Sequence, residues 1–190
     1  MNTKANTSPV ILATQEWLKE IIIGLNFCPF AKKEWINNTI DYYVSEQAKL
    51  KKALAELHEQ CEKLANSPNT ETSLLIYDGG FRDFNTYLEL VDYANEFLVE
   101  WGFEGVFQLA SFHPEYCFAD DDYDDDYDDA ANYTNRSPFP MIHLIRESSM
   151  ERVLAVYKNP ELIPENNMTL ARSKGTDYFK CKLQQFMKHT

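Results

Sequence analysis

Apolar residues recur along the chain with two different periods, and the period changes several times. A spacing of three or four residues, typical of an amphipathic helix, begins after the pair Ser8-Pro9 and continues to about residue 25. Asp83 can cap another such segment, which runs to about Trp101. The spacing predicts helices over residues 8–25, 50–64, 83–101, 148–157 and 176–188.

Shorter runs of alternating or continuous apolar residues predict strands over residues 40–44, 73–77, 105–112 and 141–146. The order α-β-α-β-α-β-β-α-α predicts an α+β fold, with one partly antiparallel sheet of about four strands covered by helices, mainly on one face. The last two strands follow each other without a helix, which favours an antiparallel pair. A ferredoxin-like arrangement is the nearest simple topology.

The chain has no internal repeat and no linker rich in Gly or Ser, so residues 1–190 are expected to form a single α+β domain. Eight of the 30 acidic residues are Asp gathered between Asp120 and Asp129, and they account for most of the net charge of −12. We expect an acidic, mobile loop near residues 119–131, because eight carboxylates repel one another. The run lacks the glycine and the final glutamate of a calcium-binding EF-hand loop.

The remaining composition limits the partners of the protein. No basic face is available for phosphate contacts, so nucleic acid is not an expected partner. The N-terminus has no signal-peptide pattern, and charged residues interrupt its apolar stretch, so no membrane association is expected. Four scattered cysteines are typical of reduced thiols in a cytoplasmic protein, and they form no metal-binding spacing. The sequence indicates neither a cofactor nor an oligomeric state.

Candidate chemistry gathers around the long segment from Pro114 to Pro140, which has no obvious helix or strand. His113 precedes this segment and His143 follows it, at neighbouring ends of two strands expected to pair. If the register places both imidazoles on one face, they can act as proton-transfer groups or metal ligands. A shift of one residue would place them on opposite faces, and the sequence does not set the register.

Arg136 lies in the returning part of that segment, between Asn135 and Ser137. A guanidinium flanked by amide and hydroxyl groups suits a carboxylate or phosphate, and Asn132 and Arg146 are candidates for the same anion site. The alternative is a structural arginine that holds the loop through backbone carbonyls.

Cys28 is the third candidate catalytic residue, as a nucleophile or an additional metal ligand. Its expected position after a helix C-terminus works against a reactive thiolate, and the alternative is a buried structural thiol.

Four motifs in the chain carry a resemblance to a known family: Asn26–Ala31, Ser111–Pro114, Asn135–Pro140 and His143–Glu147. The sequence resembles a bacterial family known as domain of unknown function 1415, over nearly the whole chain. That family has no established activity, so the resemblance implies no residue roles. Against that family, the run of Asp looks like an expansion of a loop that is shorter and less acidic.

Two hypotheses from different classes follow. The first is an enzyme or ligand-binding protein for an anionic small molecule, in which Arg136 binds the anion and His113 with His143 moves a proton. The second is a non-catalytic interaction protein in which the same motifs are structural. The first requires Cys28, His113, Arg136 and His143 to meet in one cavity.

Overall fold

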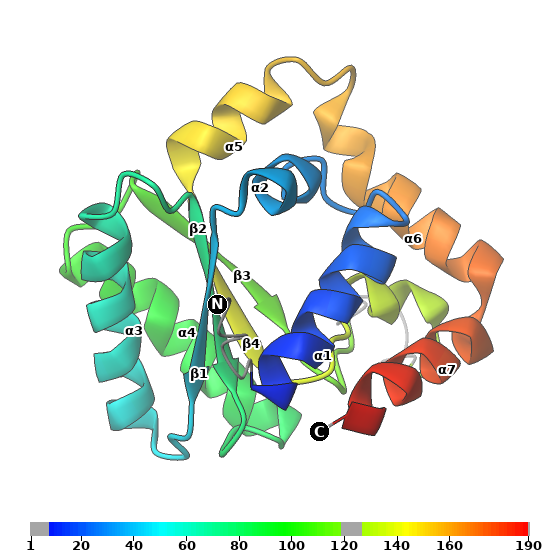
Figure 1. The fold of residues 1–190 in the computed structure, drawn as a ribbon, viewed down its shortest axis with the longest axis horizontal. Helices are drawn as coiled ribbons and strands as arrows, with labels where there is room; N and C mark the ends of the chain where they lie inside the picture. The colour runs from blue at the N-terminus through cyan, green and yellow to red at the C-terminus, as the bar shows by residue number, and fades with distance from the viewer. Residues whose placement is uncertain (1–7, 119–126, 190) are drawn as a thin grey trace, which may run out of the picture.

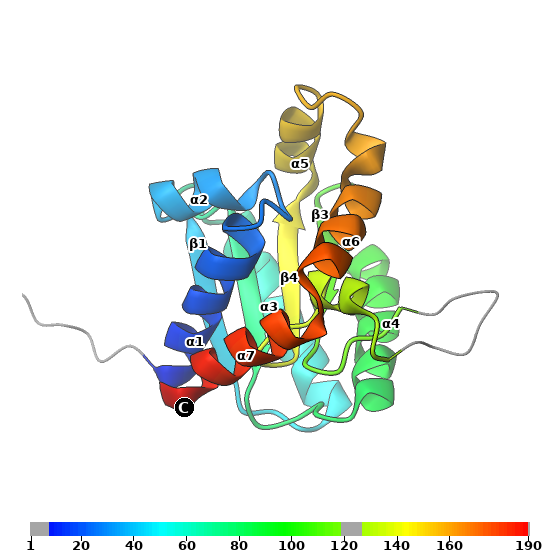
Figure 2. The same cartoon turned by 90° about the vertical axis from the view of Figure 1, so that its right-hand side faces the viewer.

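The computed structural model describes residues 8–118 and 127–189. Four described strands form one sheet, with helices on both sides (Figures 1 and 2). The helices are α1 (Pro9–Trp17), which continues as the π-helical turns η1 (Leu18–Ile23), α2 (Ala31–Asn37), α3 (Leu50–Ala65), α4 (Phe84–Glu100), α5 (Glu147–Leu154), α6 (Ile163–Lys174) and α7 (Thr176–Phe186), with short 3-10 turns η2 (Ala130–Thr134), η3 (Pro160–Leu162) and η4 (Met187–His189). The strands are β1 (Ile40–Ser45), β2 (Thr72–Tyr77), β3 (Phe107–Phe112) and β4 (Met141–Arg146).

The strand order is β1-β2-β4-β3. β1 and β2 pair in parallel, whereas β4 pairs antiparallel with both β2 and β3. The expected α+β class and the antiparallel pair β3–β4 are therefore confirmed. The ferredoxin-like arrangement is not observed, because that fold has the order β-α-β-β-α-β and here the two helix-connected units come first.

Helices cover both faces of the sheet, where mainly one covered face was expected. Leu75 and Tyr77 of β2 pack with α3 and α4, while Leu74 and Ile76 of the same strand pack on the opposite side. There α1, α6 and α7 form the second helical layer, visible to the right of the sheet in Figure 1. The uninterrupted apolar run of β2 is typical of a strand buried on both sides, and that signal predicts two layers.

Two helices on this side of the sheet, α2 and α6, were not predicted from the periodicity. α6 has few strongly apolar positions, and α2 is only seven residues long. By contrast, the predicted cap at Asp83 is present, since its carboxylate accepts a hydrogen bond of 2.9 Å from the backbone N–H of Thr86.

The expected acidic loop lies partly outside the described residues, which resume at Tyr127. Its last aspartate, Asp129, forms an ion pair of 2.7 Å with Arg172 of α6 and caps the turn η2. This end of the segment is therefore fixed against the helical layer that also holds the site.

Candidate functional site

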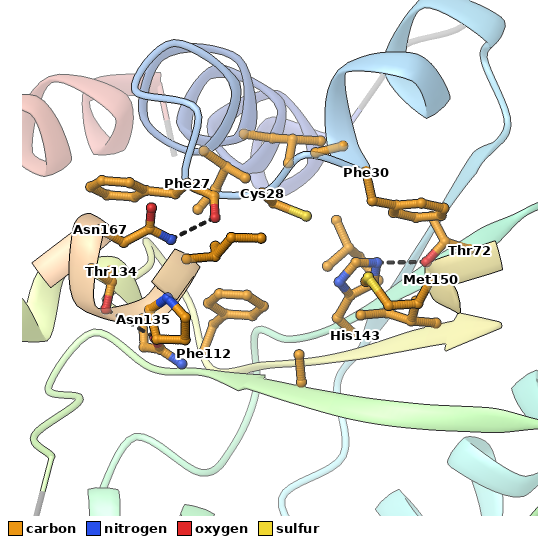
Figure 3. Close-up of a pocket in the computed structure, with 18 of the residues that line it drawn as sticks. Phe27, Cys28, Phe30, Thr72, Phe112, Thr134, Asn135, His143, Met150 and Asn167 are labelled. Carbon is orange, nitrogen blue, oxygen red and sulfur yellow. Dashed lines mark hydrogen bonds between the residues drawn. The ribbon is translucent and has the colours of Figure 1, made fainter. Parts of the chain in front are cut away.

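A cavity of about 350 Å³ lies between the sheet and the second helical layer. Its floor comes from β2, β3 and β4, and its roof from α1, the turn before α2, and α6 (Figure 3). Most of the lining is aromatic or aliphatic, including Trp17, Phe27, Phe30, Phe112 and Met168. The polar groups on its wall are few: Cys28, Glu34, Thr72, Gln108, Thr134, Asn135, His143 and Asn167.

His143 lies on the floor of this cavity. The β3–β4 register places it opposite Ala110, and the ring of Phe112 lies next to it at 6.5 Å between ring centroids. Because Ala110 has only a methyl group, the space above it remains open beside the imidazole. The imidazole therefore borders the cavity rather than packing into the sheet.

The hydroxyl of Thr72 fixes the tautomer of His143. Thr72 Oγ1 lies 2.5 Å from His143 Nε2 and 2.5 Å from the carbonyl oxygen of Leu144. A carbonyl can only accept, so the single hydroxyl proton goes to Leu144 and Nε2–H of the imidazole donates to Thr72. The other ring nitrogen, Nδ1, then carries a free lone pair and lies on the side toward the cavity (Figure 3).

Burial lowers the pKa of His143 to about 4, because the surrounding apolar residues penalise the charged imidazolium. The imidazole is therefore neutral at ordinary cellular pH. It offers a hydrogen-bond acceptor, or a base, that is available without a change of protonation state.

Cys28 belongs to the roof of the same cavity. Asn26 adopts a left-handed conformation with φ of 56°, which ends η1 and turns the chain toward α2. The thiol thus sits before α2, where the backbone N–H groups of Phe30 and Ala31 act to lower its pKa, and not simply behind a helix C-terminus as expected. Burial is nevertheless the larger influence and raises the pKa of Cys28, so the group is a protonated thiol.

Asn135 and Asn167 supply amide groups at another part of the wall. Asn135 Nδ2 donates to the carbonyl of Ser111 at 3.1 Å, and its Oδ1 lies 3.1 Å from the Thr134 hydroxyl, which is also 2.9 Å from the carbonyl oxygen of Ala131. Asn167 Nδ2 donates to the carbonyl of Phe27 at 2.7 Å and so ties α6 to the turn that carries Cys28. Asn135 is thus the one predicted anion-binding residue that lines the cavity.

His113 lies on the other side of the sheet, so the expected pairing of the two imidazoles does not occur. Ala110 is opposite His143, and His113 is three positions further along, which places it on the opposite face. There it is fully buried between Phe84 and Tyr87. Its Nδ1 accepts from the Glu115 N–H and its Nε2 donates to the Phe81 carbonyl, each at 3.0 Å, and its pKa is lowered by burial.

Arg136 holds the loop through backbone carbonyls, as its structural alternative predicted. Its guanidinium donates to the carbonyls of Tyr116 at 2.9 Å and Tyr127 at 2.7 Å, and it stacks over the rings of Tyr127 and Tyr133. The side chain is 3% exposed and does not line the cavity. Only its own backbone approaches the cavity wall, because its carbonyl accepts a hydrogen bond from Trp17 Nε1.

The other three predicted anion-binding residues have similar structural contacts. Arg146 donates to carbonyls at the C-terminal end of α3 and in the following turn, beginning with that of Leu64 at 2.5 Å. Ser137 donates to the carbonyl of Phe139. The amide of Asn132 accepts from the Phe118 N–H, so it shapes the loop rather than the cavity.

Sequence reasoning missed Thr72, Asn167 and Glu34. Thr72 opens a buried strand, and nothing in its local pattern distinguishes it from an ordinary strand threonine. Asn167 lies in a helix that the periodicity did not reveal. Glu34 is 2% exposed, with its Oε2 bound by the Thr39 hydroxyl at 2.5 Å and its Oε1 3.5 Å from the Lys33 ammonium.

Within residues 8–118 and 127–189, no group of three or more His, Cys, Asp or Glu side chains is placed to hold a metal ion. Over those same ranges, every helix is too short or too polar to cross a membrane.

Residues 9–181 match the profile of the family described as "Protein of unknown function (DUF1415)", and the chain belongs to that family. Comparison with curated proteins and with solved structures finds no match. The family description assigns no activity, so the cavity itself must indicate the function.

Proposed function

We propose that this protein binds a small, predominantly apolar molecule in the cavity between the sheet and α1, α2 and α6, with His143 as the hydrogen-bond acceptor. The observation that carries the proposal is the free Nδ1 lone pair of His143 in an apolar enclosure. A concave apolar space with a few convergent polar groups is the usual form of a small-molecule site. The volume of about 350 Å³ is near the lower end of the range of about 300–1,000 Å³ that such sites span.

An anionic ligand is not favoured. The cavity is lined by neither Lys nor Arg among the described residues, and Arg136 and Arg146 are engaged elsewhere. The charged side chain on the wall is Glu34, which is acidic. An anion would therefore lose its hydration without gaining a cation, at a cost of several kcal/mol.

The interaction-protein hypothesis accounts for part of the structure. It expects structural roles for His113, Arg136 and Arg146, and their contacts are of that kind. It gives no role, however, to the cavity or to an imidazole whose acceptor faces open space. For this reason we favour ligand binding.

A matched pair of ligands tests the proposal. 4-Ethylphenol offers an apolar body with a hydroxyl donor, whereas 4-ethylbenzoate has a similar shape and a negative charge. Thermal-shift measurements should show a rise in melting temperature with the phenol and little or none with the benzoate, because a ligand that binds only the folded state stabilises it.

Ala110→Leu should abolish this rise, because the larger side chain fills the space beside His143. Ala155→Leu, the same change at an exposed position after α5, should leave the rise unchanged. A rise with the benzoate alone, or a rise that persists in Ala110→Leu, contradicts the proposal.

A further inference from the structure

The cavity contains a nucleophile as well as a base. We propose that Cys28 is the reacting group of the site: its sulfur adds to the electron-poor carbon–carbon double bond of a bound α,β-unsaturated carbonyl compound, and His143 transfers the proton. This inference rests on the proposed binding function and names the class of ligand. Figure 3 shows the Cys28 sulfur extending from the helical roof toward the part of the cavity bordered by His143.

The position of Cys28 differs from that of every other cysteine in the chain. Cys61 is fully buried on the inner side of α3, on the opposite face of the sheet, where desolvation raises its pKa to about 12. Cys181 is exposed on α7, and Cys117 lies in the loop before the acidic segment. Cys28 is the cysteine that lines the cavity.

The surroundings of the thiol require a base. An apolar wall keeps Cys28 protonated, and a protonated thiol is a poor nucleophile. His143 is neutral for the same reason and offers a free acceptor in the same cavity. Transfer of the proton as the carbon–sulfur bond forms avoids a free thiolate in an apolar space, which is the role of general-base catalysis.

The proton and electron balance of the step needs no further reactant. The sulfur–carbon bond forms at the β-carbon while the π bond of the alkene breaks, and the thiol proton passes to Nδ1 of His143. The resulting imidazolium returns that proton to the α-carbon, so the product is a saturated thioether and His143 is neutral again. In a non-covalent complex the same Nδ1 accepts a ligand hydroxyl, whereas during addition it accepts the thiol proton.

The remaining groups suit this class of ligand. Phe27, Phe30 and Phe112 provide flat apolar surfaces for a conjugated molecule. The amides of Asn135 and Asn167 each donate one N–H to a backbone carbonyl, and each amide has a second N–H with which to bind a ligand carbonyl oxygen. The titratable groups on the wall besides His143 are Cys28 and Glu34.

The test uses benzylideneacetone, a conjugated aromatic ketone, with intact-protein mass spectrometry and peptide mapping on the full chain. We expect a single adduct at Cys28 that forms faster than any adduct at the exposed Cys181, the internal control for solution reactivity. Cys28→Ser should remove the adduct. His143→Gln keeps a donor for Thr72 but cannot carry a proton, and it should slow labelling of Cys28 by about 100-fold without changing that of Cys181.

The pH dependence provides a second readout, independent of whether a variant folds. Labelling of Cys28 should change little between pH 6 and pH 8, because His143 stays neutral throughout. An ordinary exposed thiol reacts through its thiolate, whose fraction rises about tenfold for each pH unit below a pKa of about 8.5. A steep rise at Cys28 would overturn the proposal.

The two proposals fail in different ways. Binding of 4-ethylphenol with labelling of Cys28 no faster than that of Cys181 overturns the covalent step and leaves the binding function standing. Equal labelling of Cys28 in wild type and in a folded His143→Gln variant also overturns it. Absence of both phenol binding and selective labelling overturns both.

Discussion

The hydroxyl of Thr72 stands between His143 Nε2 and the carbonyl of Leu144, at 2.5 Å from each. This one contact decides which ring nitrogen faces the cavity with a free lone pair. It also joins β2 to β4 at the strand ends that form the floor of the site. The chemistry proposed for His143 therefore depends on a residue that itself does no chemistry.

Thr72→Val should remove the hydrogen bond that sets the tautomer of His143 while keeping the shape of the side chain at position 72. The imidazole loses its acceptor and the Leu144 carbonyl loses a donor, so we expect destabilisation of about 1–3 kcal/mol in chemical denaturation. Nitrogen NMR of the imidazole should show a mixture of tautomers in place of the Nε2–H form. Thr72→Ser keeps the hydroxyl and should retain the single tautomer; a single Nε2–H tautomer in Thr72→Val would contradict the assignment.

The unfolding free energy should fall as the pH drops from 7 toward 5. The pKa of His143 is lowered to about 4 in the folded protein, whereas an unfolded histidine titrates near 6.5. Below pH 6.5 the unfolded chain binds a proton at this histidine that the folded protein does not bind. The contribution of His143 to the unfolding free energy is therefore fully present above pH 6.5 and is lost on acidification, by on the order of 1–2 kcal/mol at pH 5.

His113 adds to this loss, because its pKa is also lowered by burial. His143→Gln should therefore reduce the dependence on pH without removing it, as measured by urea denaturation at several pH values. An unchanged slope in His143→Gln would show that the imidazole is not neutral in the folded protein.

Arg136→Ala should destabilise the fold rather than weaken ligand binding. It removes two hydrogen bonds from a buried cation to backbone carbonyls and the stacking on Tyr127 and Tyr133. We expect a loss of about 2–5 kcal/mol of unfolding free energy. Arg152→Ala, at an exposed ion pair with Glu71, should cost less than about 1 kcal/mol and is the matched control.

If a folded Arg136→Ala sample loses the response to 4-ethylphenol and keeps its stability, the guanidinium belongs to the ligand site after all. Both quantities come from one thermal-shift series with and without the phenol.

The local pattern of apolar residues was sufficient to predict most of the strands and the α+β class of the fold. The alternation in β1 and the apolar runs of β2 and β4 placed these strands closely, and the absence of a helix before β4 indicated its antiparallel pairing with β3. The second helical layer was harder to predict, because α6 contributes to the cavity through a few residues and has no continuous apolar stripe.

The candidate site was predicted in part. Cys28, Asn135 and His143 line one cavity, although 115 positions separate the first from the last. His113 and Arg136 do not. For His113 the reason is register, because an odd number of residues past the Ala110–His143 pair reverses the face. Arg136 lies in the loop before β4, where its guanidinium donates to the carbonyls of Tyr116 and Tyr127. The register depends on packing along the whole sheet, so a motif read alone does not reveal it.

The central claim is that the cavity binds a small apolar molecule, and methyl NMR of methionine tests it most directly. Met150 and Met168 lie on the cavity wall, whereas Met187 lies beyond the end of α7 and outside it. Titration with 4-ethylphenol should shift the methyl signals of Met150 and Met168 in a saturable manner and leave that of Met187 unchanged. Signals that all stay fixed, or that all move together, would contradict a ligand site between the sheet and α6.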